Sequence, residues 1–158
     1  MKLRNTIAKT FTIAALTALA LSIAPTATAA DKGCSNASLT GTFVRRDTGT
    51  ILSPPAAAGL IAVVGTFTFD GNGNLTGAGV SSQHGNIVHG TSTGTYTVNP
   101  DCSGTIVSQS SGGFVSHYSF VMDDNGNEIQ YICTDSAPTA IVYSGFARRQ
   151  FPWGDPRQ

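Results

Sequence analysis

The sequence predicts an all-β protein, a single eight-stranded antiparallel up-and-down β-barrel. Clusters of Gly, Asn, Asp and Ser recur at short intervals, as expected for consecutive hairpins. Between them lie runs that alternate apolar and polar residues, the pattern of a half-buried strand. No stretch after residue 30 has the period of an amphipathic helix. Eight strands joined in sequence by short links favour an up-and-down barrel.

The alternation defines each strand from one turn to the next. Between residues 66 and 70, Phe67 and Phe69 share one face, and the threonines and Asp70 share the other. Gly-Thr-aromatic triplets recur along the chain, and strand glycines of this kind permit the bends that curl a sheet into a barrel. The segment 47–59 is the longest link and is expected to cap one end. The expected strands are 38–46, 60–70, 74–83, 86–98, 103–109, 114–123, 127–134 and 140–149.

The chain divides into three segments. Residues 1–30 have a positively charged start, a short apolar run and small residues at the end, the order of a secretory signal peptide with cleavage near Ala29 or Ala30. The apolar run is too short to span a membrane, so no membrane span is expected. Residues 31–150 form the barrel domain, and residues 151–158 are expected to be a flexible tail. The alanine-rich leader predicts a bacterial protein that is periplasmic or secreted.

Composition excludes several classes of protein. The 158 residues have a formal net charge of zero, with 11% charged and 41% hydrophobic residues. The balanced charge argues against a nucleic-acid partner. The apolar content argues against a disordered chain.

An exported protein meets conditions that form disulfides, and the sequence has three cysteines. We expect a bridge between Cys34 and Cys102, which would fasten the N-terminal segment to a hairpin turn. Cys133 lies in an expected strand and is interpreted as a small buried residue rather than a nucleophile or metal ligand.

Candidate metal and catalytic motifs are weak. His84 and His89, with His117 or Asp123, do not have the spacing of a structural zinc site. The clusters at 70–74 and 123–127 resemble the start of a calcium loop but lack its closing Glu, so they are interpreted as hairpin turns. No phosphate-binding, dinucleotide or nucleophile-elbow motif is present. We therefore predict no metal, no cofactor and no catalytic residue.

Several segments resemble a group of secreted bacterial proteins of unknown function. They are CSNASLTGTF at 34–43, VGTFTFDGNGNL at 64–75, GTYTVNPDCSGT at 94–105, EIQ at 128–130 and GFARRQ at 145–150. That group in turn resembles the eight-stranded barrels of allene oxide cyclases, dirigent proteins and lipocalins. The resemblance implies the fold and covers nearly the whole chain after residue 30. No cyclase active-site residue can be matched to a position here, so it implies no enzymatic activity.

Two features suggest ligand-binding residues in the barrel lumen. Aromatic residues recur on single faces of the last strands, and arginine pairs lie near the ends of the first and last strands, where one member of each pair should point inward. An inward arginine would either form a salt bridge at the seam with Glu128, Asp123 or Asp124, or hold an anionic head group. The candidate ligand-binding residues are Phe114, Tyr118, Phe120, Tyr131, Tyr143, Arg46 and Arg148.

Three functions remain open at this point. The leading hypothesis is an exported barrel that binds a small, mostly apolar molecule in its lumen. The second is a cyclase or isomerase on the same barrel that shapes a reactive ligand in the lumen, where confinement and orientation would supply much of the effect. A lumen with a paired acid and base would favour this hypothesis. The third is a barrel with a filled lumen that acts in the cell envelope through its surface or as a homo-oligomer.

Overall fold

The computed structural model describes residues 33–123, 125–135 and 140–151. The signal peptide expected at residues 1–30 and all but the first residue of the expected tail lie outside the described residues. No helix among the described residues is long and apolar enough to cross a membrane.

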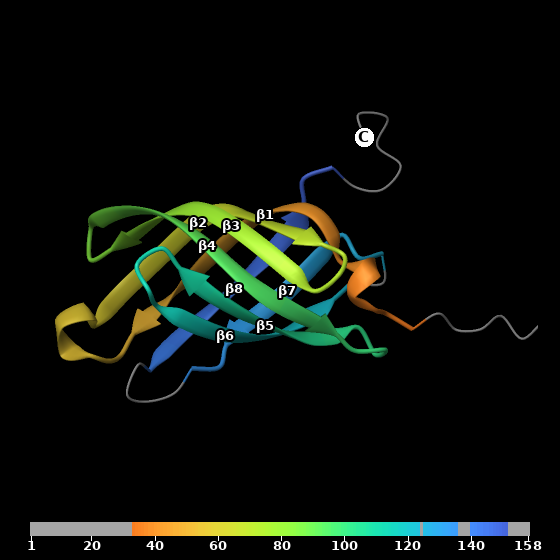
Figure 1. Cartoon of the computed structure of the whole chain (residues 1–158). Helices are drawn as coiled ribbons and strands as arrows, with labels where there is room; N and C mark the ends of the chain where they lie inside the picture. The colour runs from red at the N-terminus through yellow and green to blue at the C-terminus, as the bar shows by residue number, and fades with distance from the viewer. Residues whose placement is uncertain (1–32, 124, 136–139, 152–158) are drawn as a thin grey trace, which may run out of the picture. The chain divides into compact units, whose positions relative to one another are not determined.

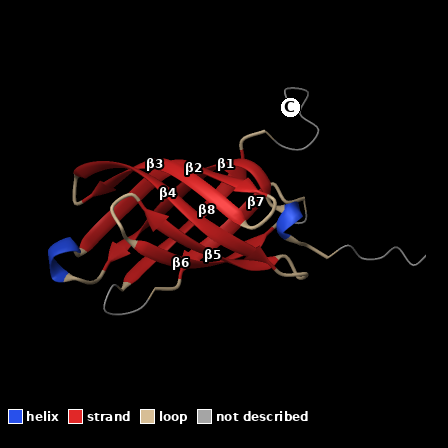
Figure 2. Cartoon of the chain, in the orientation of Figure 1, coloured by secondary structure: helices blue, strands red, loops and turns tan. Residues whose placement is uncertain are grey.

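The described chain is a closed antiparallel barrel of eight strands in sequence order (Figure 1). This confirms the predicted fold class. Figure 2 shows that the chain is mostly strand, with two short 3-10 turns at opposite ends of the barrel. The strands are β1 (Thr40–Ile51), β2 (Gly59–Asp70), β3 (Asn74–Gln83), β4 (Asn86–Val98), β5 (Ser103–Ser110), β6 (Val115–Met122), β7 (Glu128–Cys133) and β8 (Ile141–Arg149).

The first strand is longer than the sequence predicted. β1 continues to Ile51, and residues 43–51 pair with both β2 and β8 to close the barrel. The link therefore covers only 52–58, not 47–59, and includes the 3-10 turn η2 (Pro55–Ala57). The polar run from Asp47 to Thr50 has the composition of a loop, but neighbouring strands on both sides satisfy its backbone hydrogen-bonding groups.

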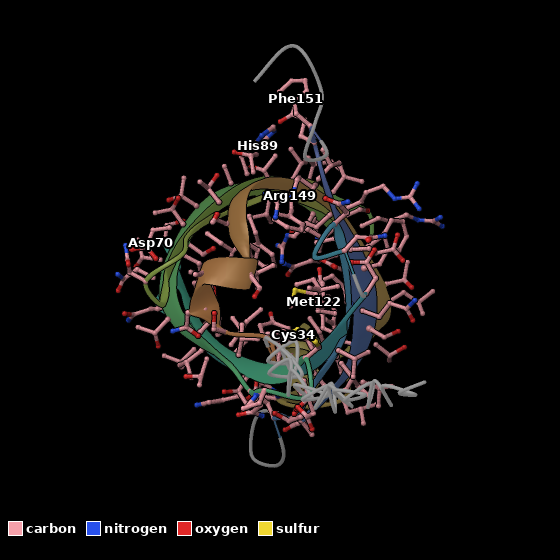
Figure 3. The ribbon with its side chains drawn as sticks, turned by 90° about the vertical axis from the view of Figure 1, so that its right-hand side faces the viewer. Cys34, Asp70, His89, Met122, Arg149 and Phe151 are labelled. Carbon is pink, nitrogen blue, oxygen red and sulfur yellow. A yellow bond between two sulfur atoms is a disulfide. The ribbon has the colours of Figure 1, made fainter. Side chains whose placement is uncertain are left out.

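One end of the barrel is covered by the N-terminal segment, and we call it the capped end. The 3-10 turn η1 (Asn36–Ser38) lies across it in Figure 3, and Leu39 behind η1 is fully buried. The Tyr96 hydroxyl donates to the Leu39 carbonyl at 2.8 Å, and the Val98 N–H donates to Asn36 Oδ1 at 2.8 Å.

A disulfide joins Cys34 to Cys102 at this end, as the sequence predicted. Cys102 lies in the turn between β4 and β5, so the bridge fastens the N-terminal segment to that hairpin. The Cys34 N–H also donates to the Pro100 carbonyl at 3.1 Å.

The acidic turn clusters form hairpins, as predicted. Asp70 ends β2, and its carboxylate accepts hydrogen bonds from the backbone N–H of Asn72 at 2.7 Å and of Asn74 at 2.9 Å. Asp123 likewise accepts from the backbone of Asn127 and Glu128. The carboxylates thus complete the turns by binding N–H groups.

Candidate functional site: the barrel interior

The interior changes along the barrel axis. Near the capped end it is filled by tightly packed apolar side chains, and Phe43, Phe67 and Ile129 are at most 1% exposed. In the middle, Tyr131 and Tyr143 are 5% exposed and Tyr118 is 8% exposed. Beyond them, most inward-facing residues are only half-buried or less, and Ser108 on β5 and Cys133 on β7 are the buried exceptions among the described residues. The end opposite the cap is therefore accessible to solvent, and we call it the open end.

The two walls of the open half differ in chemistry. Isoleucines face inward on β8, β1 and β2, where Ile51 pairs with Ile141. Serines face inward on β3 to β6, where Ser92 pairs with Ser110 and Ser108 pairs with Ser116. A molecule in this half would contact an apolar wall on one side and a row of hydroxyl groups on the other.

A buried carboxylate lies at the boundary between the two halves. Asp47 on β1 has no exposed side-chain surface. It accepts hydrogen bonds from the hydroxyl of Tyr143 at 2.6 Å and from the hydroxyl of Tyr131. Gly145 pairs with Asp47 across the seam, and a Cβ at this glycine would collide with the carboxylate. The missing side chain on β8 therefore makes the room that Asp47 occupies.

Arg45 lies one inward position before Asp47 and is its ion-pair partner. Arg45 Nη1 is 3.3 Å from Asp47 Oδ2, and the guanidinium carbon lies 4.3 Å from the ring centre of Phe67. The Arg45 side chain keeps 15% exposure, and its Nε is buried without a hydrogen-bond partner. The contact with Asp47 thus uses only part of a group that has five N–H donors.

The tyrosines pack as a group beside this ion pair. The ring of Tyr118 on β6 meets Tyr131 at 5.7 Å and 81°, and meets Tyr143 at 6.1 Å and 49°. These are the edge-to-face and tilted geometries that aromatic rings favour. Tyr118 lies two residues from Ser116 on the inner face of β6, so it is the member of the group next to the serines of the open half.

Burial controls ionisation in this cluster. It raises the pKa of Asp47, and the ion pair with Arg45 and the two phenol hydrogen bonds oppose this rise without cancelling it. Burial also raises the pKa of Tyr131 and Tyr143, and the nearby Asp47 carboxylate adds to the effect. Burial alone would lower the pKa of Arg45, but Asp47 and the tyrosines reverse this, so Arg45 is a permanent cation.

Cys133 is the free cysteine of the described chain, and it is buried. Its thiol donates to Asp135 Oδ2 at 3.3 Å, while Asp135 Oδ1 lies 2.7 Å from His117 Nδ1. Burial raises the pKa of the Cys133 thiol to about 11. No group of three or more His, Cys, Asp or Glu side chains among the described residues could hold a metal ion.

Four of the predicted ligand-binding residues are inside the barrel. Tyr118, Tyr131 and Tyr143 come together in the middle. Phe120 is 3% exposed, and its ring fills the space left by the missing side chain of Gly104 in the packed half.

The prediction that Phe114, Arg46 and Arg148 face the lumen is wrong. Phe114 is 71% exposed, because β6 begins one residue later and Phe114 lies in the loop before it. Arg46 and Arg148 are exposed on the outer wall, since inward positions on β1 and β8 have odd numbers. Arg148 forms a salt bridge on the outer wall between β7 and β8, with its Nη2 2.9 Å from Glu128 Oε2, rather than the expected bridge from an inward arginine at the seam.

Sequence reasoning missed Arg45, Asp47 and Arg149 as interior residues. One arginine of each pair does point inward, as expected, but it is Arg45 and Arg149. Arg149 donates to the carbonyls of Thr40 and Gly126 at the capped end. The burial of Phe43 could have revealed the parity of β1, because Phe43, Arg45 and Asp47 alternate along one strand face.

Exposed apolar side chains surround the open end. Five of them, which we call the apolar rim, are Leu52, Leu60, Ile87, Phe114 and Val142, each at least 55% exposed. They belong to the link after β1, the starts of β2, β4 and β8, and the loop before β6. Among the described residues of the loops at this end, Asp135 is the one charged side chain.

Comparisons with known proteins bear on the fold. No protein-family model matches the chain, and the search of curated proteins found no significant match. Among solved structures, a redesigned β-barrel, mFAP1, bound to DFHBI, is similar with a TM-score of 0.51 and 16% identity, covering 72% of this chain and 97% of that chain. A related redesigned barrel, mFAP0, also bound to DFHBI, has a TM-score of 0.48 and 17% identity, covering 71% and 99%.

The S-type phycobiliprotein lyase CPES from Guillardia theta has a TM-score of 0.42 and 8% identity, covering 74% of this chain and 92% of that chain. At these identities the likeness concerns the fold alone. The more specific resemblance to allene oxide cyclases and dirigent proteins stays a prediction. The chain is thus an eight-stranded β-barrel that the comparisons assign to no family.

Proposed function

We propose that this protein binds a small molecule with a largely apolar body in the open half of its barrel. The observation that carries the proposal is the division of the interior. The capped half is packed with aromatic and aliphatic side chains, whereas the open half has small serines on one wall and isoleucines on the other. Ligand sites commonly combine an apolar surface with a few polar groups that fix orientation.

The entrance supports the same function. The apolar rim surrounds the open end, and monomeric proteins seldom expose a group of large apolar side chains without a binding role. The redesigned β-barrel mFAP1, which has a similar fold, is bound to DFHBI, and this likeness supports the proposal. An extracytoplasmic location, as the leader and the disulfide suggest, belongs to this proposal.

An enzymatic function has less support. A cyclase or isomerase would need an acid and a base that are free to meet the substrate. Asp47 is fully buried, and both its oxygens already accept hydrogen bonds from tyrosines. The elevated pKa values of Tyr131 and Tyr143 also make these phenols poor acids.

Native mass spectrometry tests the proposal on protein purified without denaturation from cells that produce it. We expect an added mass that disappears when the protein is denatured. A matched pair of β6 variants locates it: Ser116→Leu fills the open half, whereas Ser119→Leu places the same side chain on the outer wall. Loss of the added mass in Ser116→Leu but not in Ser119→Leu supports binding inside the barrel. A clean mass for the unmodified protein, or equal loss in both folded variants, contradicts it.

A further inference from the structure

We infer that the ligand carries a carboxylate head group, which Arg45 holds in the middle of the barrel. This inference rests on the proposed function and names the chemical class of the ligand. Four observations carry it: the incomplete pairing of Arg45, its position, the engagement of the two nearby acids by other donors, and the hydroxyl groups that line the interior.

The guanidinium of Arg45 is only partly satisfied by the fold. Its one ion-pair contact is a single Nη1–Oδ2 distance of 3.3 Å to Asp47, rather than the two parallel hydrogen bonds that a guanidinium can make with a carboxylate. Its Nε is enclosed and has no acceptor among the described residues. Buried polar groups are almost always paired, so an enclosed N–H without a protein acceptor is a place where a water or a ligand can bind.

Asp47 is held by other donors and does not depend on Arg45 alone. The hydroxyls of Tyr131 and Tyr143 bind its two oxygens. Arg45 therefore remains available to a second acceptor group without leaving Asp47 unpartnered. The Arg45 side chain as a whole keeps 15% exposure.

The position of Arg45 limits where its partner can come from. Phe43 and Asp47, the neighbouring inward residues on β1, are both buried, and the ring of Phe67 covers one face of the guanidinium. The packed capped half lies on one side of this group and the open half on the other. An acceptor can therefore approach from the open half, past Tyr118.

Few acids in the described interior would repel a carboxylate there. Asp47 is engaged as described, and Asp135 near the open end is occupied by His117 and the Cys133 thiol. The serine hydroxyls and the Tyr118 hydroxyl can donate to the same head group.

Carboxylate is the favoured class because of the shape and charge of the guanidinium. The planar, permanently charged guanidinium can donate two parallel hydrogen bonds to the two oxygens of a carboxylate. Such charge-assisted hydrogen bonds are about twice as strong as neutral ones. The apolar wall of Ile51, Ile61 and Ile141 suits the hydrocarbon part of such a molecule. The ligand is thus a small amphipathic acid, with its head group toward Arg45 and its tail toward the apolar rim.

Fluorescence titration with a matched pair of probes tests the inference. The probes are 11-(dansylamino)undecanoic acid and its methyl ester, which share the body and differ in the head group. We expect the unmodified protein to bind the acid at least about tenfold more tightly than the ester, a difference typical of one charge-assisted contact. Arg45→Met should abolish the preference and Arg45→Lys should reduce it. Arg46→Met, one residue away on the outer wall, should preserve it.

The outcomes separate the inference from the proposed function. If the unmodified protein binds acid and ester equally, the carboxylate inference is overturned and binding in the barrel stands. If it binds neither probe, both are overturned. If Arg45→Met fails to fold, the preference of the unmodified protein and its reduction in Arg45→Lys still decide the matter. A preference that survives in folded Arg45→Met also overturns the role of Arg45.

Discussion

The pairing of Asp47 with two phenols and one guanidinium has consequences for stability. A carboxylate without exposed surface is costly unless its hydrogen bonds are complete, and here three side chains complete them. The two phenol donors come from β7 and β8, so they hold β1 to the last two strands from inside the barrel. Loss of one donor therefore weakens the seam as well as the carboxylate.

Replacing Tyr143 by Phe removes one of these hydrogen bonds and keeps the ring. We expect the free energy of unfolding to fall by about 1.5–3 kcal/mol, the range for a hydrogen bond to a charged group. Urea denaturation measures it. Tyr118→Phe is the matched control, since Tyr118 belongs to the same aromatic group and makes no hydrogen bond to Asp47 in the described structure, so its loss should be smaller. Equal losses would show that Asp47 gains nothing from Tyr143.

The thiol of Cys133 should be unreactive in the folded protein. Its pKa is raised to about 11 from an ordinary value of 9.0, mainly by burial. Because only the thiolate reacts, a shift of this size lowers the thiolate fraction near pH 8 by about 100-fold. Iodoacetamide labelling followed by mass spectrometry should be slow at pH 8 and should accelerate as the pH rises toward 11. The same protein in urea is the control, and labelling at equal rates in both states would refute the prediction.

The sequence could place the interior tyrosines but not the interior charges. Tyr118, Tyr131 and Tyr143 lie on strands whose alternation is clear, so their common direction followed from the pattern. Arg45 and Arg46 are neighbours of the same type, and a shift of one residue in register exchanges them. The residues after Arg46 are polar, so the sequence did not predict that β1 continues to Ile51. These residues belong to the sheet because β2 and β8 pair with them.

At the scale of elements, the capped end depends on one covalent bond and a few hydrogen bonds. η1 is only three residues long, and short 3-10 turns have little stability of their own. The Cys34–Cys102 bridge and the hydroxyl of Tyr96 hold it against the barrel. Both cysteines were predictable as partners because one belongs to a turn and the other to an N-terminal segment that needs an anchor.

Removing the bridge should destabilise the barrel. The two cysteines are 68 residues apart, and a loop of this length corresponds to about 4 kcal/mol on the chain-entropy view. We expect the double variant Cys34→Ser, Cys102→Ser to lose about this free energy of unfolding in urea. Cys133→Ser is the control for replacing a cysteine by serine, because it removes a thiol without removing the bridge. A double variant as stable as the unmodified protein would show that η1 and Tyr96 hold the cap without the bridge.

The hairpin between β2 and β3 should depend on acid pH through Asp70. The side-chain amide of Asn74 and the backbone N–H groups of Asn74 and Asn72 lower the pKa of Asp70 below its ordinary value of 3.8. A lowered pKa means that the stabilisation is present above pH 3.8 and is lost as the pH falls through the lowered value. Carboxyl NMR titration measures it. Asn74→Ala should return the pKa toward 3.8, and an Asp70 that titrates above 3.8 would contradict the hydrogen-bonded turn.

At the scale of the whole molecule, the two ends of the barrel differ in chemistry. The turns of the capped end carry acidic residues such as Asp70, Asp101 and Asp123, and the nearby outer wall of β7 and β8 carries Glu128 and Arg148. The open end has the apolar rim. The sequence could not show this contrast, because the rim residues are far apart along the chain and meet only when the barrel closes.

Serine at two rim positions should change the surface and leave the fold intact. We expect Leu60→Ser, Phe114→Ser to elute earlier from a phenyl hydrophobic-interaction column, because these two side chains are 74% and 71% exposed. The free energy of unfolding should change by less than about 0.5 kcal/mol per site. Val44→Ser, Val121→Ser, on the outer wall away from the open end, is the matched control and should shift elution less. Equal shifts would argue against a distinct apolar surface at the open end.

The cap across one end of the barrel also determines how its contents can be exchanged. Because the capped end is closed and held by a disulfide, a ligand that enters the barrel through the open end must also leave through the open end. A competing ligand therefore has no separate route by which to displace the bound one. The rate of ligand exchange should therefore equal the dissociation rate of the bound ligand at any concentration of the competing ligand. On the proposed function, a barrel closed at one end suits the retention and release of a ligand rather than its passage through the barrel.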